Sequence, residues 1–125
     1  MIKSFFGGES RERDLDTRRR NLAEIEGGVR INPVPITAGE QVDIIYEGLL
    51  ANHGADKVFL HAGFGNPQNW QKVIDYPMVK TAEGWETTVR VDNASRFNFC
   101  FKDSAGNWDN NSGKNWSYEI HYGGL

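Results

Sequence analysis

Cysteine is almost absent from this sequence: its 125 residues contain a single one, Cys100. One cysteine excludes an internal disulfide, so the fold has to be stabilised by packing and hydrogen bonding. Long apolar runs are also missing, since none approaches the roughly 20 residues of a membrane-spanning helix. The start, MIKSFFGGESRERD, becomes charged before any apolar stretch develops, so we expect no signal peptide. If Met1 is the native start, we expect a cytoplasmic protein with no membrane partner.

An excess of positive charge is the second thing that the sequence lacks. It has 14 basic and 17 acidic residues, a formal net charge of −3, and no visible basic stripe. Aromatic side chains that stack on bases normally accompany a basic groove, so nucleic acid is not the expected partner. The length fits one domain with one core. Aromatic residues make up 12% of the chain and should contribute most of the buried apolar surface of that core.

Recognisable catalytic motifs are missing as well. The run GFGNPQ at 63–68 begins like a dinucleotide-binding loop but lacks the third glycine and the following helix. Cys100 stands among three phenylalanines, which favours a structural thiol over a nucleophile. His53, His61 and His121 lack metal-ligand spacing, and no pair of carboxylates suits glycoside hydrolysis. We therefore expect no enzyme, no cofactor and no metal.

The chain changes character near residue 30. Residues 9–30 contain six arginines and six acidic residues, and Leu15, Leu22 and Ile25 fall at helical spacing. Gly27-Gly28 would end such a helix. The pattern predicts a charged N-terminal segment over 1–30 containing a short amphipathic helix, followed by a second unit over 31–125. The apolar stripe is thin, so the helix would pack on that unit, on a second copy or on a partner enzyme.

From residue 31 onward, short runs alternate apolar and polar residues between turn sequences. Alternation of period two marks half-buried strands. Several short strands with no helical pattern between them predict an all-β fold, an antiparallel, immunoglobulin-like β-sandwich. The residues that share a face are Val42, Ile44 and Tyr46; Val58 and Leu60; Trp85, Thr87, Val89 and Val91; Phe97, Phe99 and Phe101; and Tyr118, Ile120 and Tyr122.

The four tryptophans divide by context. Trp85 and Trp116 are in phase with apolar strand residues, which predicts core packing. Trp70 and Trp108 lie in Gly/Asn-rich loops, and His61 falls on the face opposite Val58 and Leu60. Flat rings suit the apolar faces of sugars, and amides with an imidazole suit hydroxyl groups. From this chemistry alone, sugar binding, a protein-interaction patch and plain packing all remain open.

Two stretches of the chain resemble a known family. NFCFKDSAGNWDNNSGKNW is the more specific, and VFLHAGFG followed by Trp70 is a second anchor. Over residues 31–122 the sequence resembles the starch-binding carbohydrate-binding modules of families 25 and 53. The resemblance implies a β-sandwich that binds α-1,4-glucans such as starch, glycogen and maltooligosaccharides, and that catalyses nothing.

The same resemblance implies which residues form the site. Carried over position by position, it gives two tryptophan platforms, Trp70 and Trp108, flanked by His61. Asn110 and Asn111 would shape the site or contact hydroxyl groups. Modules of this kind usually serve a glucan-active enzyme, which is therefore an expected partner. The competing hypothesis is an immunoglobulin-like protein-interaction module without sugar binding.

Overall fold

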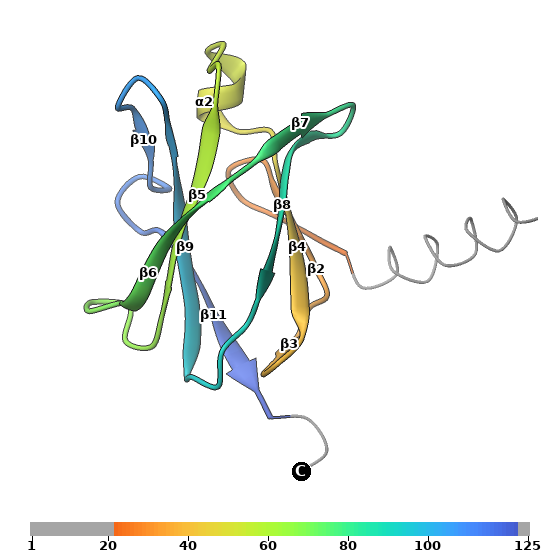
Figure 1. Ribbon diagram of the computed structural model, residues 1–125, viewed down its shortest axis with the longest axis vertical. Helices are drawn as coiled ribbons and strands as arrows, with labels where there is room; N and C mark the ends of the chain where they lie inside the picture. Colours follow the sequence, from red (N-terminus) through yellow and green to blue (C-terminus); the bar gives the residue numbers. More distant parts are fainter. Residues whose placement is uncertain (1–21, 123–125) are drawn as a thin grey trace, which may run out of the picture.

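Two β-sheets packed face to face form the protein, as Figure 1 shows for the computed structural model, which describes residues 22–122. In order across the sheet, the first comprises β1 (Ala23–Ile25), β2 (Val29–Asn32), β4 (Gln41–Tyr46), β8 (Gly84–Arg90) and β7 (Val79–Thr81). The second comprises β3 (Ile36–Thr37), β11 (Trp116–His121), β9 (Arg96–Asp103), β5 (Val58–Phe64) and β6 (Gln71–Pro77), and β10 (Trp108–Asp109) also pairs with β9.

The pairing between strands confirms the predicted antiparallel sandwich. Within the described residues every pair of strands is antiparallel except β3 with β11. The helical content of this part is one short helix, α2 (Leu49–Asn52). Among the described residues no helix has the length and apolar character needed to cross a membrane.

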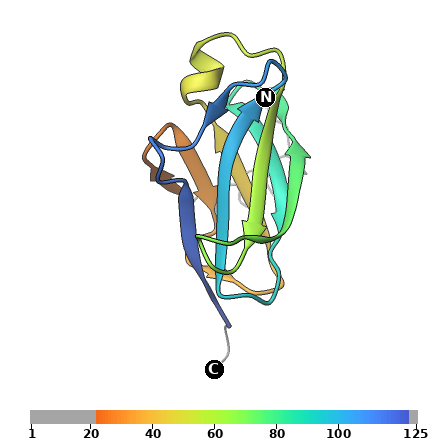
Figure 2. The same ribbon diagram turned by 90° about the vertical axis from the view of Figure 1, so that its left-hand side faces the viewer.

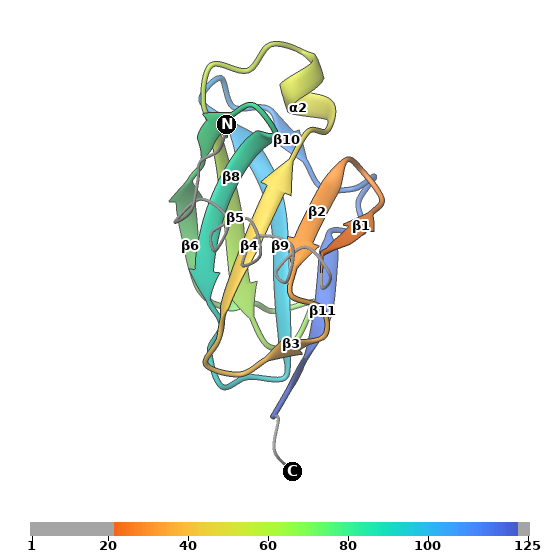
Figure 3. The same ribbon diagram turned by 90° about the vertical axis from the view of Figure 1, so that its right-hand side faces the viewer.

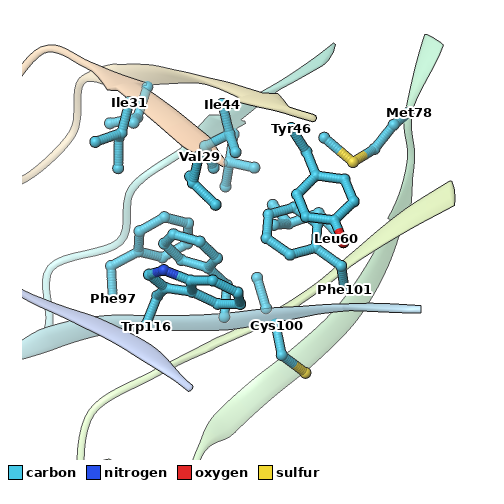
Figure 4. Packing of buried hydrophobic residues seen from close by; sticks show 14 of the residues in the cluster. Val29, Ile31, Ile44, Tyr46, Leu60, Met78, Phe97, Cys100, Phe101 and Trp116 are labelled. Carbon is cyan, nitrogen blue, oxygen red and sulfur yellow. The ribbon is translucent and has the colours of Figure 1, made fainter. Parts of the chain in front are cut away.

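Aromatic rings from both sheets fill the space between them (Figure 4). The Tyr46 ring stacks on Phe101 with centroids 4.0 Å apart, and Phe99 stacks on Trp116 at 5.7 Å. Trp85 and Trp116 are 6% and 3% exposed, so their predicted place in the core is confirmed.

The predicted faces of the strands are confirmed with one exception. The alternating residues of β4, β5 and β9 predicted to face inward are buried. Tyr122 was expected to share the inward face of Tyr118 and Ile120, but it is 44% exposed. It lies just beyond the end of β11, and its hydroxyl donates to the carbonyl of Ala94.

The prediction of a helix ending at Gly27-Gly28 is wrong for residues 23–30, which form a β-hairpin (Figure 3). Gly27 and Gly28 adopt φ values of +82° and +77°, which suit a tight turn between β1 and β2. Residues 22 and 25 are three positions apart, a spacing that a helix favours but a hairpin also tolerates. The predicted boundary near residue 30 falls inside β2. The rest of the predicted helix lies outside the described residues.

Candidate functional site

Three of the predicted site residues meet on the outer face of the six-stranded sheet. His61 is on β5, Trp70 immediately precedes β6, and Trp108 begins β10. The His61 ring centroid lies 5.8 Å from that of Trp70 and 5.1 Å from that of Trp108. Figure 2 shows this side of the molecule, where β5 and β9 run side by side. We call His61, Trp70 and Trp108 the aromatic cluster.

The two indole planes of the aromatic cluster are strongly inclined to each other. The imidazole plane of His61 makes an angle of 38° with Trp70 and of 89° with Trp108. These two angles differ by 51°, so the two indole planes are at least 51° apart. The tryptophans therefore cannot form one flat surface.

Trp70 is held by the loop that precedes it and by a close approach to the sheet. The backbone N–H of Gln68 donates to Asn66 Oδ1 at 2.8 Å, and the Trp70 indole donates to the Pro67 carbonyl at 2.7 Å. A β-carbon added at Gly63 would lie 2.9 Å from the β-carbon of Trp70. Glycine at position 63 thus lets the half-buried Trp70 lie directly on β5.

Trp108 is presented by a tight turn and a short strand. Asp103 Oδ1 accepts hydrogen bonds from the backbone N–H groups of Ala105 and Asn107, which closes the turn between β9 and β10. Trp108 then pairs with Lys102 across the two strands and remains 49% exposed. The Lys102 ammonium lies 5.3 Å from the centroid of the Trp108 ring, within the range of a cation–π contact.

Asp109 anchors this strand to the core. It is buried, and its Oδ2 accepts a hydrogen bond of 2.6 Å from the hydroxyl of Tyr46 on the opposite sheet. Its Oδ1 accepts one of 3.2 Å from the backbone of Asn111. Burial, reinforced by the hydrogen bond to Asp109, raises the pKa of Tyr46, so the phenol stays protonated and can donate. Trp108 faces solvent because the next residue is fixed inward.

Asn110 and Asn111 shape the loop of residues 110–115. Asn110 Oδ1 accepts from the backbone of Gly113 at 2.9 Å, and the Asn111 side chain donates to the carbonyl of Asn115 at 3.1 Å. Asn111 has a φ of +57°, a left-handed conformation that asparagine tolerates better than most residues. Both amides thus bond within their own loop, which follows Trp108.

Two residues missed by the sequence analysis adjoin the aromatic cluster. Asp75 Oδ1 lies 2.6 Å from His61 Nδ1, and Asp75 Oδ2 lies 2.5 Å from the Lys102 ammonium. Burial alone would raise the pKa of Asp75, but hydrogen bonds from Lys102 and His61 outweigh it and lower the pKa. Asp75 stands between Ile74 and Tyr76 in a strand-like run, and no motif marks it.

Cys100 lies beside His61 on the neighbouring strand, and its side chain is buried. The two are direct partners across β5 and β9, so both side chains are on the outer face, and Figure 4 shows Cys100 pointing away from the aromatic core. Burial, followed by the negative charges of Asp109 and Asp75, raises the pKa of the thiol to about 12. A thiol that stays protonated agrees with a structural role. Among residues 22–122, no group of three or more His, Cys, Asp or Glu is placed to hold a metal.

Comparison with known protein families adds an independent finding. A family model described as "Starch/carbohydrate-binding module (family 53)" matches residues 42–99. The resemblance to family 53 is confirmed. The family 53 match runs from β4 into β9 and contains His61, Trp70 and Asp75, whereas Trp108 follows it. Comparisons with curated proteins and with solved structures gave no match.

The family description bears on function at a general level. It names a binding module for starch or other carbohydrate and no reaction. The match therefore supports carbohydrate binding, with starch-like polysaccharide as the partner.

Proposed function

We propose that this protein binds α-1,4-glucans without catalysis, and that the aromatic cluster is the binding site. The observation that carries the proposal is that His61 lies within 6 Å, ring centre to ring centre, of both Trp70 and Trp108 on one exposed face. Indole faces pack against the apolar faces of pyranose rings, and an imidazole can donate to or accept from sugar hydroxyls. Within this proposal, Asn110 and Asn111 act by shaping the loop behind Trp108.

The inclination of the two indoles supports a curved ligand. An α-1,4-glucan coils, so successive glucose rings present their faces in different directions. Two indole planes at least 51° apart match such a chain. A flat β-1,4-glucan would need coplanar platforms, which these two tryptophans do not offer.

The expected affinity is modest. By analogy with base stacking on aromatic side chains, each stacked ring contributes about 1–3 kcal/mol. After the costs of association, two platforms give a dissociation constant of roughly micromolar to millimolar. Tighter retention on starch granules or glycogen would come from several sites acting on one polymer.

Calorimetric titration with two oligosaccharide series tests the proposal. We expect heat and saturation with maltooligosaccharides of about three or more units, and none with cellooligosaccharides of equal length. Gel mobility in soluble starch, glycogen or xylan, and pull-down on cellulose, extend the test to polymers. Equal heats for the two series would contradict the curved site. A protein-interaction module would be retained by none of these polysaccharides.

A further inference from the structure

A chain of polar contacts joins His61 to Trp108 beneath the surface that the proposed ligand would occupy. His61 contacts Asp75, Asp75 pairs with Lys102, and the Lys102 ammonium lies over the Trp108 ring. The three polar side chains are 27%, 37% and 28% exposed, so each is partly enclosed and still reachable by a ligand.

The strand registers place these residues together. β5 pairs with β6 so that His61 lies directly opposite Asp75. β9 pairs with β10 so that Lys102 lies directly opposite Trp108. Since β5 and β9 are neighbours, the two pairs come from four adjacent strands and project from the same face.

The contact between Asp75 and His61 determines which ring nitrogen carries the proton. An ionised carboxylate only accepts hydrogen bonds, so at 2.6 Å the Nδ1 of His61 must be the donor. In the neutral imidazole the other nitrogen, Nε2, then carries a lone pair and accepts. The lowered pKa of Asp75 agrees with an ionised carboxylate at neutral pH.

We infer that Asp75 is a positioning residue of the site: it fixes His61 so that Nε2 accepts a hydrogen bond from a ligand hydroxyl, and it steadies Lys102 against Trp108. This inference rests on the proposed function. One carboxylate thereby sets the orientation of the polar group and supports one platform. An exposed ion pair adds little to stability, so Asp75 should matter for binding far more than for folding.

The experiment measures the tautomer of neutral His61 and the affinity for a maltooligosaccharide in the same variants. In the unsubstituted protein, nitrogen NMR of the imidazole should show the proton on Nδ1. Asp75→Ala should move it toward Nε2 and weaken binding about tenfold. Asp75→Asn keeps an oxygen that can accept from Nδ1, and it should recover part of both effects. If Asp75→Ala unfolds, Asp75→Asn serves as the test, with a partial shift and partial weakening expected.

The matched control is Asp43→Ala on the other sheet. Asp43 is half-buried and accepts a hydrogen bond of 2.7 Å from the Thr88 hydroxyl. Its loss should change neither the His61 tautomer nor the affinity. A second control is the double variant of Asp75 and His61 to alanine. If Asp75 acts mainly through His61, the double variant should have nearly the same dissociation constant as His61→Ala alone. Independent residues would instead weaken binding by the product of the two single-variant factors.

The outcomes separate this inference from the proposed function. An unchanged tautomer in Asp75→Ala, or an unchanged dissociation constant, would overturn the positioning role while leaving the glucan site in place. If the unsubstituted protein binds no maltooligosaccharide, the proposed function and the ligand-facing role of Nε2 both fail. The NMR measurement then still decides whether Asp75 sets the imidazole.

Discussion

At the scale of single residues, exposure separates the tryptophans into two groups. Trp85 and Trp116 are buried in the core, whereas Trp108 is half exposed and Trp70 is half-buried and packs against the core cluster. The same residue type thus serves core packing in two places, presents a ring to solvent at Trp108, and is intermediate at Trp70. The printed sequence shows this division through context, because the two less buried tryptophans occur among Gly, Asn and Pro.

Alanine substitutions should reveal this division. Trp108→Ala should weaken maltooligosaccharide binding tenfold or more, since about 1–3 kcal/mol of stacking is lost, with little change in melting temperature. Trp85→Ala should instead cost about 3–5 kcal/mol of unfolding free energy, as a large core deletion. Calorimetry and melting curves measure the two effects. If Trp108→Ala unfolds the protein, the residue is part of the core and the proposed site is wrong.

Cys100 provides a prediction about pH. Its folded pKa of about 12 is above the ordinary value of 9.0, so the folded state holds its proton more tightly. The resulting stability is complete below about pH 9 and is lost as the pH rises through about 12. Urea unfolding at pH 8 and pH 11 should therefore show a smaller loss of stability in Cys100→Ala than in the unsubstituted protein. Equal losses would show that the thiol does not contribute.

At the scale of strands and loops, the sequence predicted the elements that carry a buried stripe. β4 and the first residues of β5 alternate clearly, because one face of each meets the core. β9 is buried on both faces, and its stripe shows in the sequence as phenylalanines at alternate positions. β6 could not be recognised in this way, since nearly all of its residues are exposed at the sheet edge. β6 is a strand because it pairs with β5, and alternation of apolar and polar residues in the sequence does not reveal such pairing.

The same limit applies to the site. His61 was predicted from strand parity, and Trp70 and Trp108 from their loops. Asp75 and Lys102 escaped prediction because their position beside His61 depends on the registers of separate strand pairs. Register is set by the whole sheet, and no short motif encodes it.

The strand and loop that follow the turn at residue 106 should act as one anchored unit. Tyr46→Phe removes the hydroxyl that donates to the buried Asp109 carboxylate, and it retains the ring. Asp109 Oδ2 then lacks its donor and the Leu50 N–H lacks its acceptor, which should cost about 1–3 kcal/mol of unfolding free energy. Glucan affinity should also fall, because Trp108 adjoins the loosened Asp109. Denaturant unfolding and calorimetry measure both.

Tyr122→Phe is the control, since the exposed Tyr122 donates its hydroxyl to the Ala94 carbonyl near the sheet end. Two variants of equal stability would contradict the anchor.

At the scale of the whole molecule, the turn between β1 and β2 in the first sheet contacts the segment that follows Trp108 in the second sheet. The Trp116 indole donates to the carbonyl of Glu26 at 3.0 Å, and the Lys114 ammonium lies 3.1 Å from the Glu26 carboxylate. Gly27 lies against Trp116 so closely that an added β-carbon would be 2.5 Å from the ring. The family match runs from β4 into β9, strands that lie together on one side of the two sheets, and the β1–β2 hairpin extends the first sheet on the other side.

Two truncated chains should distinguish the contribution of residues 22–28 to stability from that of residues 1–21. Chains beginning at residue 22 and at residue 29 both lack residues 1–21, so their difference reports only on residues 22–28. The shorter chain loses β1 and the Glu26 carbonyl, which leaves the Trp116 indole N–H without its acceptor. The loss of this partly buried hydrogen bond should cost about 0.5–1.5 kcal/mol, and the lost packing of Ile25 adds to this. Its urea midpoint should be clearly lower. Glu26→Ala keeps the carbonyl and removes the exposed contacts of the carboxylate with Lys114 and Asn111, so it should lower the midpoint much less than the truncation does. Equal midpoints for the two truncated chains would show that the hairpin is dispensable to the sandwich.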